Sequence, residues 1–325
     1  MKNKVNIFLA DDLHQQGIDL LKKKFNVVSL KSLTNKELIL KLKDLSPKSD
    51  SSADALIVRS VRKIDRNFLQ KTAKKTNIKL ICTVSAGFDN IDTIAASEAG
   101  IDIMNVAGAN STSAAEYTMG LILAAVKNIV PANSKMQKGT FDYSLFKNTE
   151  LSGKTIGIIG VGRIGSKVAV LAKAFGMKII GNDIKESLKK KYRFIEFIPL
   201  NTLLRNSDIV TIHTPLDNTT RYLINKKNIS LLRNDSVLIN TARGGVVEEA
   251  ALLAALKKGK LRCACIDVFE QEPGFDKKFL KLKNLVLTPH LAGKTSESRE
   301  RMAVESAVKV TKYFQNTGRS PKLID

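Results

Sequence analysis

Short apolar runs alternate with longer amphipathic segments through the first third of the chain. The apolar runs are typical of buried strands, and the segments between them carry apolar residues at helical spacing. The predicted strands lie at 5–10, 26–30, 55–58, 79–84 and 101–105, and the predicted helices at 15–24, 35–45, 65–75 and 113–128. Strands that alternate with helices in this way predict a parallel sheet covered by helices.

The same alternation resumes after residue 150, so the chain contains a second α/β pattern. Its predicted strands lie at 156–159, 178–181, 209–213, 236–240, 263–268 and 285–288, with helices at 166–175, 200–206, 225–232 and 248–258. A final helix at 295–314 follows the last strand, and we expect it to return to the first domain. The expected division is a first domain at 1–103 and 293–325 and a second at 104–292, both doubly wound parallel sheets.

The second domain opens with a glycine-rich turn between a strand and a helix. Gly160, Gly162 and Gly165 form the pattern G-x-G-x-x-G, and Asp183 ends the next predicted strand 18 residues beyond Gly165. The first glycine permits a tight turn, the second a close approach of the backbone to a pyrophosphate, and the third close packing of helix on strand. Asp183 would accept hydrogen bonds from the hydroxyls of the adenosine ribose, and its negative charge would repel a 2′-phosphate. The pattern predicts a dinucleotide site that favours NAD.

Composition limits the remaining classes of function. The formal net charge is +22, from 53 basic and 31 acidic residues, but the lysines are scattered and few aromatic residues accompany them. Solvated lysine faces therefore explain the charge better than nucleic-acid binding, and the positive field should attract anionic ligands. The sequence contains no apolar run long enough to cross a membrane and no signal peptide. Cys263 and Cys265 fit alternate positions on a buried strand, so we expect no metal site and a reduced, cytoplasmic protein.

Polar side chains capable of catalysis follow three of the late strands. Arg243 lies just beyond the strand at 236–240. Asp267 lies at the end of the next strand with Glu272 just beyond it, and His290 follows the strand at 285–288. Because ligands bind beyond the carboxyl ends of parallel strands, these groups are expected near the nicotinamide end of the dinucleotide.

The chain resembles the D-isomer-specific 2-hydroxyacid dehydrogenases, and among them the phosphoglycerate dehydrogenases most. The motifs that carry the resemblance lie at 86–92, 108–116, 160–165, 241–244, 267–269, 272–273 and 289–290, in the order of the family. The resemblance implies a Rossmann cofactor domain inserted into a flavodoxin-like substrate domain, a homodimer, and a small anionic 2-hydroxy or 2-oxo acid as substrate. The chain ends soon after the returning helix, so no C-terminal regulatory domain is expected. Lys294 stands where the family usually has a small residue.

The resemblance also implies catalytic roles. His290 would be the general base that takes the hydroxyl proton as hydride leaves C2, and Glu272 would hold its imidazole by a hydrogen bond. Arg243 would bind the substrate carboxylate and polarise the C2 oxygen, a target that suits a guanidinium group. Asp267 would position the nicotinamide carboxamide.

Further residues are implied to contact the ligands. The cofactor residues are Gly160, Gly162, Arg163, Ile164, Gly165, Asp183, His213, Thr214, Pro215, Thr219, Thr241, Ala242, Asp267 and Gly293. The substrate residues are Arg59, Ser60, Ser85, Ala86, Gly87 and Asn110, where the backbone at 85–87 would cradle the carboxylate. His213 is either structural or a neighbour of the cofactor. Arg59 and Arg62 are either ligands of a substrate phosphate or surface charges.

These inferences together predict an NAD-dependent oxidoreductase of small D-2-hydroxy acids, with 3-phosphoglycerate as the first choice of substrate. Glyoxylate or hydroxypyruvate reduction and D-lactate oxidation are alternatives within the same chemistry. A dinucleotide-sensing scaffold or corepressor is the alternative from another class, because such members of the family retain the catalytic residues.

Overall fold

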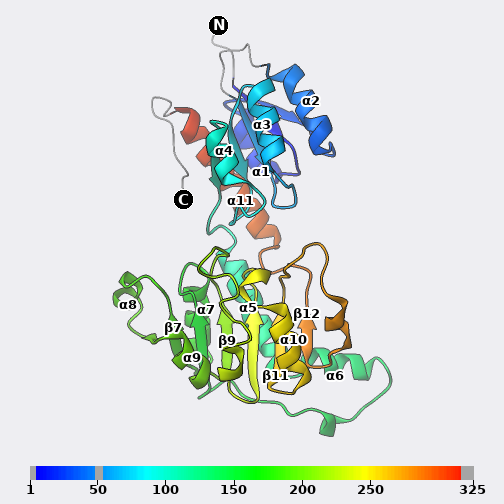
Figure 1. Ribbon diagram of the computed structural model, residues 1–325, viewed down its shortest axis with the longest axis vertical. Helices are drawn as coiled ribbons and strands as arrows, with labels where there is room; N and C mark the ends of the chain where they lie inside the picture. Colours follow the sequence, from blue (N-terminus) through cyan, green and yellow to red (C-terminus); the bar gives the residue numbers. More distant parts are fainter. Residues whose placement is uncertain (1–4, 48–53, 316–325) are drawn as a thin grey trace. The chain divides into compact units, whose positions relative to one another are not determined.

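The computed structural model describes residues 5–47 and 54–315, which fall into two compact units (Figure 1). Unit 1 is formed by residues up to Asn110 together with those from Thr295 onward, and unit 2 by Ser111–Lys294. The parts of the expected first domain at 1–4, 48–53 and 316–325 lie outside the described residues.

Unit 1 is built on a sheet of five parallel strands in the order β2-β1-β3-β4-β5. The strands are β1 (Asn6–Leu9), β2 (Asn26–Ser29), β3 (Asp54–Val58), β4 (Ile78–Thr83) and β5 (Asp102–Asn105). This is the flavodoxin-like order, in which the sequence begins in the middle of the sheet and reverses direction once. The flavodoxin-like fold predicted from the resemblance is confirmed.

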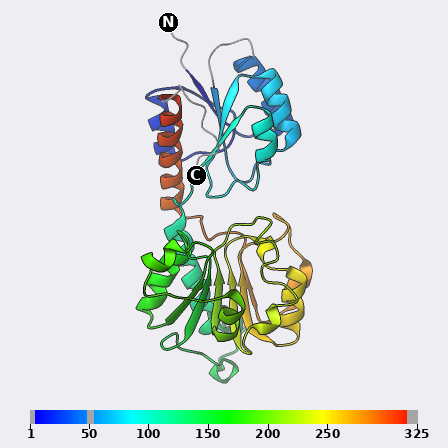
Figure 2. The same cartoon turned by 60° about the vertical axis from the view of Figure 1, so that its left-hand side comes forward.

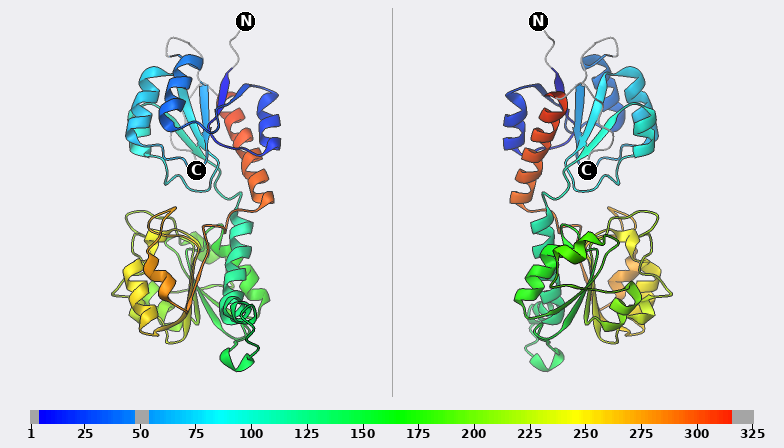
Figure 3. Two further views of the ribbon diagram at one scale, coloured as in Figure 1. Left: turned by 90° about the vertical axis from the view of Figure 1, so that its right-hand side faces the viewer. Right: turned by 90° about the vertical axis from the view of Figure 1, so that its left-hand side faces the viewer.

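Helices cover both faces of this sheet because its strands alternate apolar side chains between the faces. Ile7 and Leu9 face one core and Phe8 faces the other, and all three are buried. The helices are α1 (Gln15–Lys22), α2 (Asn35–Leu45), α3 (Arg66–Lys75), α4 (Thr93–Glu98) and α11 (Ser296–Gln315). Helices α1 and α11 lie side by side on one face, and α2, α3 and α4 cover the other (Figures 2 and 3). Gly17 allows the close approach, because a Cβ there would lie 2.7 Å from the carbonyl oxygen of Ala303.

Unit 2 is built on seven parallel strands in the order β12-β11-β10-β9-β6-β7-β8. The strands are β6 (Thr155–Ile159), β7 (Lys178–Asn182), β8 (Glu196–Phe197), β9 (Ile209–Ile212), β10 (Ser236–Asn240), β11 (Leu261–Ile266) and β12 (Leu285–Leu287). Counted from β6, the first six strands follow the Rossmann order 3-2-1-4-5-6. The chain therefore changes direction between β6 and β9, where such sheets bind ligands.

The helices of unit 2 form two layers around this sheet. They are α5 (Ser111–Val126), α6 (Ile129–Met136), α7 (Gly165–Ala174), α8 (Ser187–Lys191), α9 (Leu200–Asn206) and α10 (Glu249–Lys257). Helices α5 and α7 share one apolar core with one face of the sheet, and α9 and α10 share the other core. The buried character expected for the helix at 113–128 is found in α5.

One predicted helix is wrong. Residues 225–232 contain only the single 3₁₀ turn η2 (Ile229–Leu231). The side chain of Asn225 bonds the carbonyl of Tyr222 and the amide of Lys227, and Asn228 Oδ1 accepts the amide of Asn225. Such side-chain bonds to the backbone compete with the helical pattern that the apolar spacing suggested. The short elements α4, α6, α8 and β8 were not predicted.

Candidate active site

The glycine-rich turn lies where β6 passes into α7, and its glycines are required by close packing. Gly160 has φ +85°, and a Cβ there would lie 2.8 Å from the backbone of His213. A Cβ on Gly165 would lie 2.0 Å from the carbonyl oxygen of Gly160, whereas one on Gly162 would meet open space. Arg163 is exposed and Ile164 half-buried between them. The turn thus leaves its backbone open to a phosphate at the start of α7.

Asp183 follows β7 and supports this turn. Its Oδ2 accepts the amide N–H of Val161 at 2.7 Å, and its Oδ1 accepts the amide N–H of Lys185 at 2.9 Å. The carboxylate therefore lies next to the glycine turn, as the fingerprint requires. Its selection against a 2′-phosphate stays a prediction.

The loop after β9 presents polar atoms that lack partners. His213 Nε2 lies 2.9 Å from Thr211 Oγ1, and burial lowers the pKa of His213 to about 3, so its ring is neutral. Among the described residues, His213 Nδ1 and Thr214 Oγ1 are buried and have no hydrogen-bond partner. A polar ligand at this edge would satisfy both atoms, which fits a dinucleotide.

Pro215 and Thr219 lie further along the same loop and are exposed. The amide and hydroxyl of Thr219 both donate to Asp217 Oδ1, at 2.8 and 2.6 Å, and the carbonyl of Pro215 accepts the Thr220 hydroxyl at 2.7 Å. Thr219 therefore forms part of a turn of its own loop.

Arg243 lies just beyond β10 in a tightly fixed loop. Asn240 Nδ2 donates to the carbonyl of Arg243 at 2.9 Å, and Arg243 Nη1 donates to the carbonyl of Ala242 at 2.7 Å. Thr241 is buried, and its Oγ1 lies 2.9 Å from Thr118 Oγ1 of α5. A Cβ on Gly244 would lie 1.9 Å from the backbone of Phe269, so only glycine allows this loop to pack on the loop after β11.

Glu272 and His290 form a direct hydrogen bond. The Oε2 of Glu272 lies 2.6 Å from Nδ1 of His290, and its Oε1 accepts the amide N–H of Phe269 at 2.9 Å. Burial is the largest single influence on the pKa of Glu272 and raises it. The hydrogen bonds from His290 and Phe269 and the charges of His290 and Arg243 outweigh burial, so the net pKa is lowered. The carboxylate is thus ionised beside the imidazole.

Asp267 holds the loop that carries His290. This carboxylate is fully buried at the end of β11. Its Oδ1 accepts the hydroxyl of Thr288 at 2.6 Å and the amide of Leu291 at 2.8 Å, and its Oδ2 accepts the amide of Ala292 at 2.9 Å. His290 has φ +55°, a left-handed conformation that non-glycine residues rarely adopt. The hydrogen bonds of Asp267 on both sides of it fix this conformation. Gly293 follows Ala292 in the same loop.

The predicted substrate residues lie at the carboxyl ends of the strands of unit 1. Ser85 follows β4, and its hydroxyl donates to the carbonyl of Gly87 at 2.6 Å. The carbonyl of Ala86 accepts Asn105 Nδ2 at 2.7 Å. Arg59 follows β3, is half-buried and is succeeded by the exposed Ser60. The half-buried Asn110 directly precedes α5.

Arg62 fits neither of its two predicted alternatives. Its side chain is 10% exposed and its guanidinium pairs with Asp11 at 3.0 Å, so it is neither a surface charge nor an available ligand. The sequence patterns did not indicate a role for Asp11, nor that Asp267 holds the His290 loop by hydrogen bonds. The only signal for Asp11 is its place directly after the first strand, because its partner lies 51 positions away.

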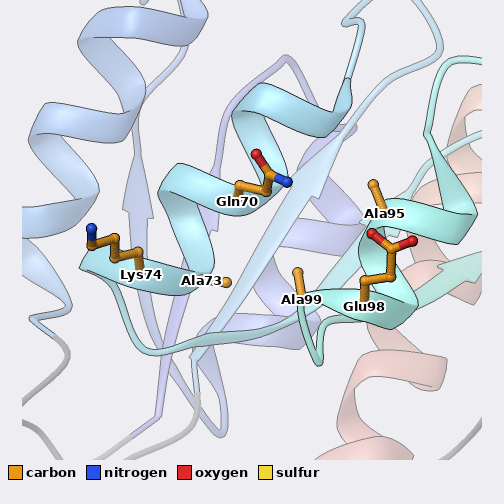
Figure 4. Close-up of a pocket in the computed structure, with 6 residues that line it drawn as sticks. All are labelled: Gln70, Ala73, Lys74, Ala95, Glu98 and Ala99. Atoms are coloured by element: carbon orange, nitrogen blue, oxygen red, sulfur yellow. The ribbon is translucent and has the colours of Figure 1, made fainter.

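A separate pocket of about 360 Å³ lies on the helical surface of unit 1, between α3 and α4 (Figure 4). It contains none of the predicted site residues. The residues that line it are Gln70, Ala73, Lys74, Ala95, Glu98 and Ala99.

Two features are absent from the described residues, 5–47 and 54–315. No three His, Cys, Asp or Glu side chains are placed to hold a metal ion together. No helix within the same residues has the length and hydropathy needed to span a membrane.

Comparison with known proteins identifies the family. Residues 119–292 match the model of the NAD binding domain of D-isomer specific 2-hydroxyacid dehydrogenases. The chain is 40% identical over 313 residues to D-3-phosphoglycerate dehydrogenase of Methanocaldococcus jannaschii, which covers 96% of this chain but 58% of that protein. It is 39% identical over 273 residues to hydroxypyruvate reductase of Thermotoga maritima, with 83% of this chain and 88% of that one covered. The chain therefore spans little more than half the length of the first relative.

Solved structures agree with this result. The D-lactate dehydrogenase of Aquifex aeolicus, complexed with NAD and lactic acid, is 31% identical, with 95% of each chain covered and a TM-score of 0.78. The glyoxylate reductase of Paecilomyes thermophila is 25% identical, with 99% of this chain and 98% of that one covered and a TM-score of 0.87. The predicted family, the two-sheet α/β fold and the NAD-binding domain are confirmed. The chain belongs to the D-isomer specific 2-hydroxyacid dehydrogenase family.

Proposed function

We propose that this enzyme transfers hydride between C2 of a small D-2-hydroxy acid and NAD, with 3-phosphoglycerate as its first-choice substrate. The 2.6 Å hydrogen bond between His290 and Glu272 is the observation that carries the proposal. Unit 2 would bind the cofactor and unit 1 the substrate, and the cofactor domain expected at 104–292 belongs to the same proposal. Bound NAD supplies the hydride acceptor.

His290 is the proposed acid–base group. In the direction of oxidation, its Nε2 takes the proton of the C2 hydroxyl as the C2–H bond breaks and the 2-oxo acid forms. In reduction it returns that proton to the C2 oxygen. The ionised carboxylate of Glu272 holds Nδ1 by a hydrogen bond, which fixes the orientation of the ring and leaves Nε2 for the proton transfer. His290 and Glu272 are therefore sufficient for the transfer of a proton to and from the C2 oxygen of the substrate.

Arg243 is the proposed ligand of the substrate carboxylate and C2 oxygen. Its backbone is fixed by Asn240 and by the packing of Gly244, which limits the positions open to its side chain. A guanidinium on a carboxylate makes two parallel charged hydrogen bonds, and these orient C2 as well as bind it. Asp267 acts in this proposal by fixing the His290 loop, in addition to any contact with the nicotinamide.

The dinucleotide would lie along the edge between β6 and β9. The glycine turn and the start of α7 would hold the pyrophosphate, and Asp183 the adenosine ribose. The unsatisfied atoms of His213 and Thr214 support a polar ligand at this place. Thr241, Ala242 and Gly293 would line its nicotinamide end, and the exposed Thr219 its outer rim.

Hydroxypyruvate is the second candidate substrate. The similarity to the Thermotoga maritima hydroxypyruvate reductase extends over 88% of that protein, a larger share than the 58% of the phosphoglycerate dehydrogenase. Trials of 3-phosphoglycerate, glycerate, D-lactate and glycolate with NAD, and of the corresponding oxo acids with NADH, test the proposal. Turnover is expected to be fastest with a three-carbon acid. Failure of every acid to be turned over would contradict the proposed function.

We also propose that two copies associate through the segment that follows α5. Residues 129–146 expose large apolar side chains, with Phe141 83% and Tyr143 87% accessible. Hydrogen bonds from Asn128 to Lys147 and Asn148 anchor the base of this segment. Exposed apolar groups of this size are typical of interfaces. Sedimentation should give a dimer that the double substitution F141S/Y143S converts to monomers, whereas a monomeric unsubstituted protein would contradict the proposal.

A further inference from the structure

Two reciprocal hydrogen bonds tie the loop that carries Glu272 to the start of helix α10, which contacts β11 (Figure 1). Glu249 is the first residue of α10, and its Oε1 accepts the amide N–H of Glu270 at 2.8 Å. In turn, Oε1 of Glu270 accepts the amide N–H of Glu249 at 3.0 Å. Each carboxylate therefore holds the backbone of the other residue, and we call the two the Glu249–Glu270 pair.

Two further contacts fix the same part of the loop. The hydroxyl of Tyr222 donates to Oε2 of Glu270 at 2.9 Å, and the amide of Tyr222 donates to the carbonyl of Gly245 at 2.8 Å. Gly244 packs directly on the loop, because a Cβ there would lie 2.4 Å from the amide nitrogen of Glu270. Glu270 is therefore held by three segments of unit 2, through its backbone and through both oxygens of its side chain.

The Glu249–Glu270 pair joins the two segments that carry proposed catalytic groups. Arg243 directly precedes the 3₁₀ turn η3 (Gly244–Val246), which leads into α10. Glu270 lies two residues before Glu272, and the amide of Phe269 on its other side donates to Oε1 of Glu272 at 2.9 Å. The charge of Arg243 acts on the carboxylate of Glu272. A bond between the start of α10 and residue 270 therefore limits how far these two groups can move apart.

Attraction between charges does not explain this pair, because both its members are carboxylates. Burial raises the pKa of Glu249, the hydrogen bond from the Glu270 amide opposes this effect, and the charges of Glu270 and Asp276 add to it, so the net pKa is raised. Two like charges held together cost free energy. The arrangement gains the placement of two backbone amides instead, and the Glu270 carboxylate lies at the N-terminus of α10, where the helix dipole favours an anion.

We propose that Glu249 and Glu270 are positioning residues, which together with Tyr222 hold the loop after β11 so that the carboxylate of Glu272 stays on Nδ1 of His290. Residues 271–274 of this loop are all exposed, so burial of their side chains does not fix it. The inference rests on the proposed function, because it specifies what keeps the acid–base pair of that function together.

The first test separates the chemical step from binding. E249A leaves the amide of Glu270 without its acceptor, so kcat with the best 2-hydroxy acid should fall about 10-fold, a part of what general acid–base catalysis contributes. KM for the acid and Kd for NADH should stay within about twofold of the unsubstituted enzyme. E249Q keeps an oxygen that can accept this amide, so it should retain at least about a third of the normal kcat. Equal losses in the two variants, or an unchanged kcat in E249A, would overturn the inference.

The second test asks whether Glu249 acts through Glu272. The double variant E249A/E272Q should lose no more kcat than E272Q alone, because the carboxylate that Glu249 helps to position is already absent. Multiplied losses in the double variant would overturn the positioning role. E270A removes the acceptor of the Glu249 amide and of the Tyr222 hydroxyl, and should lower kcat as E249A does. It decides the matter if E249A fails to fold.

E248A is the matched control for both tests. Glu248 directly precedes Glu249 and also accepts a backbone amide, that of Lys226 at 2.8 Å, which lies in a different loop. E248A therefore removes the same kind of bond from the same end of α10, and its kcat should stay within about twofold of the unsubstituted enzyme. A fall equal to that of E249A would show that any disturbance of this helix end lowers turnover, and would overturn the inference.

Nuclear magnetic resonance gives a measurement that needs no turnover. The chain contains 3 histidines, so the ring signals of His290 can be assigned by comparison with H290Q. On the alkaline limb of a pH titration, the two ring nitrogens report which of them carries the proton of the neutral imidazole. This proton should lie on Nδ1 in the unsubstituted protein, where Glu272 accepts it, and should move in part to Nε2 in E249A.

The outcomes of this measurement separate the inference from the proposed function. A His290 ring that is the same in E249A and in the unsubstituted protein would overturn the inference alone. A ring without the Nδ1 proton in the unsubstituted protein would overturn the proposed acid–base pair itself. The comparison stays decisive where no acid is turned over, in which case the proposed function fails separately.

Discussion

Two aspartates, one in each unit, follow a parallel strand and hold a loop of their own unit in a similar way. Asp267 follows β11 and binds the hydroxyl of Thr288 before His290 and the amides of Leu291 and Ala292 after it. Asp11 follows β1 and binds the backbone of Arg59. Each carboxylate fixes a loop that presents a side chain predicted to contact substrate.

The two differ in what else they bind, and this difference separates their expected roles. Asp267 is fully buried and accepts hydrogen bonds from two amides and a hydroxyl. Asp11 is 15% exposed and also pairs with the buried guanidinium of Arg62. Asp267 therefore stabilises backbone geometry alone, whereas Asp11 also neutralises the guanidinium of Arg62. The difference teaches that a carboxylate after a parallel strand can hold a loop by its backbone alone, or hold it together with a buried cation.

The largest effect on stability is expected from Asp267→Ala. The substitution leaves the amides of Leu291 and Ala292 and the hydroxyl of Thr288 without their acceptor. Buried unsatisfied groups cost about 1–3 kcal/mol each, so the free energy of unfolding should fall by about 3 kcal/mol or more. Chemical denaturation measures it, with E98Q as a surface control. A fall in the free energy of unfolding of less than about 1 kcal/mol would contradict the account that Asp267 holds the His290 loop.

Arg243→Lys should lower kcat/KM about 100-fold while leaving stability nearly unchanged. Lysine keeps the charge but cannot make the two parallel hydrogen bonds of a guanidinium. Steady-state kinetics with the best acid measure the loss. Arg221→Lys, at an exposed arginine over the ring of Tyr222, serves as the control and should match the unsubstituted enzyme. Equal activity of the two variants would remove Arg243 from the proposed site.

The smallest effect concerns His213 and the pH dependence of stability. Because burial lowers its folded pKa from 6.5 to about 3, the unfolded chain binds a proton that the folded one refuses between these values. Burial of the neutral His213 ring therefore leaves the free energy of unfolding undiminished above about pH 6.5. As pH falls from there toward 3, protonation of His213 in the unfolded chain lowers the free energy of unfolding. H213Q should therefore lose less stability than the unsubstituted protein between pH 7 and 5. If the free energy of unfolding changed with pH in the same way for both proteins, His213 would make no contribution to the pH dependence of stability.

Local patterns predicted most of the fold. The apolar runs at 156–159 and 178–181 and the glycines between them correspond to β6, the turn and α7, because each is determined by short-range spacing. The helix expected at 225–232 failed because asparagine side chains bond the backbone there, and apolar spacing does not report such bonds.

The candidate site was predictable only where residues lie close in sequence or in a motif. Glu272 and His290 are 18 positions apart; the parallel strands predicted that they lie near each other, but only the resemblance to a known family paired them by a hydrogen bond. The pairing of Asp11 with Arg62 depends on how β1 and β3 meet in the sheet. Patterns of local spacing do not predict a contact between residues 51 positions apart. The sequence alone therefore could not show that Arg62, and not Arg59, pairs with Asp11.

The most direct measurement is turnover and cofactor binding of His290→Gln with the best 2-hydroxy acid. Glutamine can hydrogen-bond at this place but cannot carry the proton, so kcat should fall about 10²- to 10⁴-fold. Fluorescence titration should give an affinity for NADH within about threefold of the unsubstituted enzyme. Retention of more than a tenth of the normal turnover would contradict the proposal that the His290–Glu272 pair performs the proton transfer.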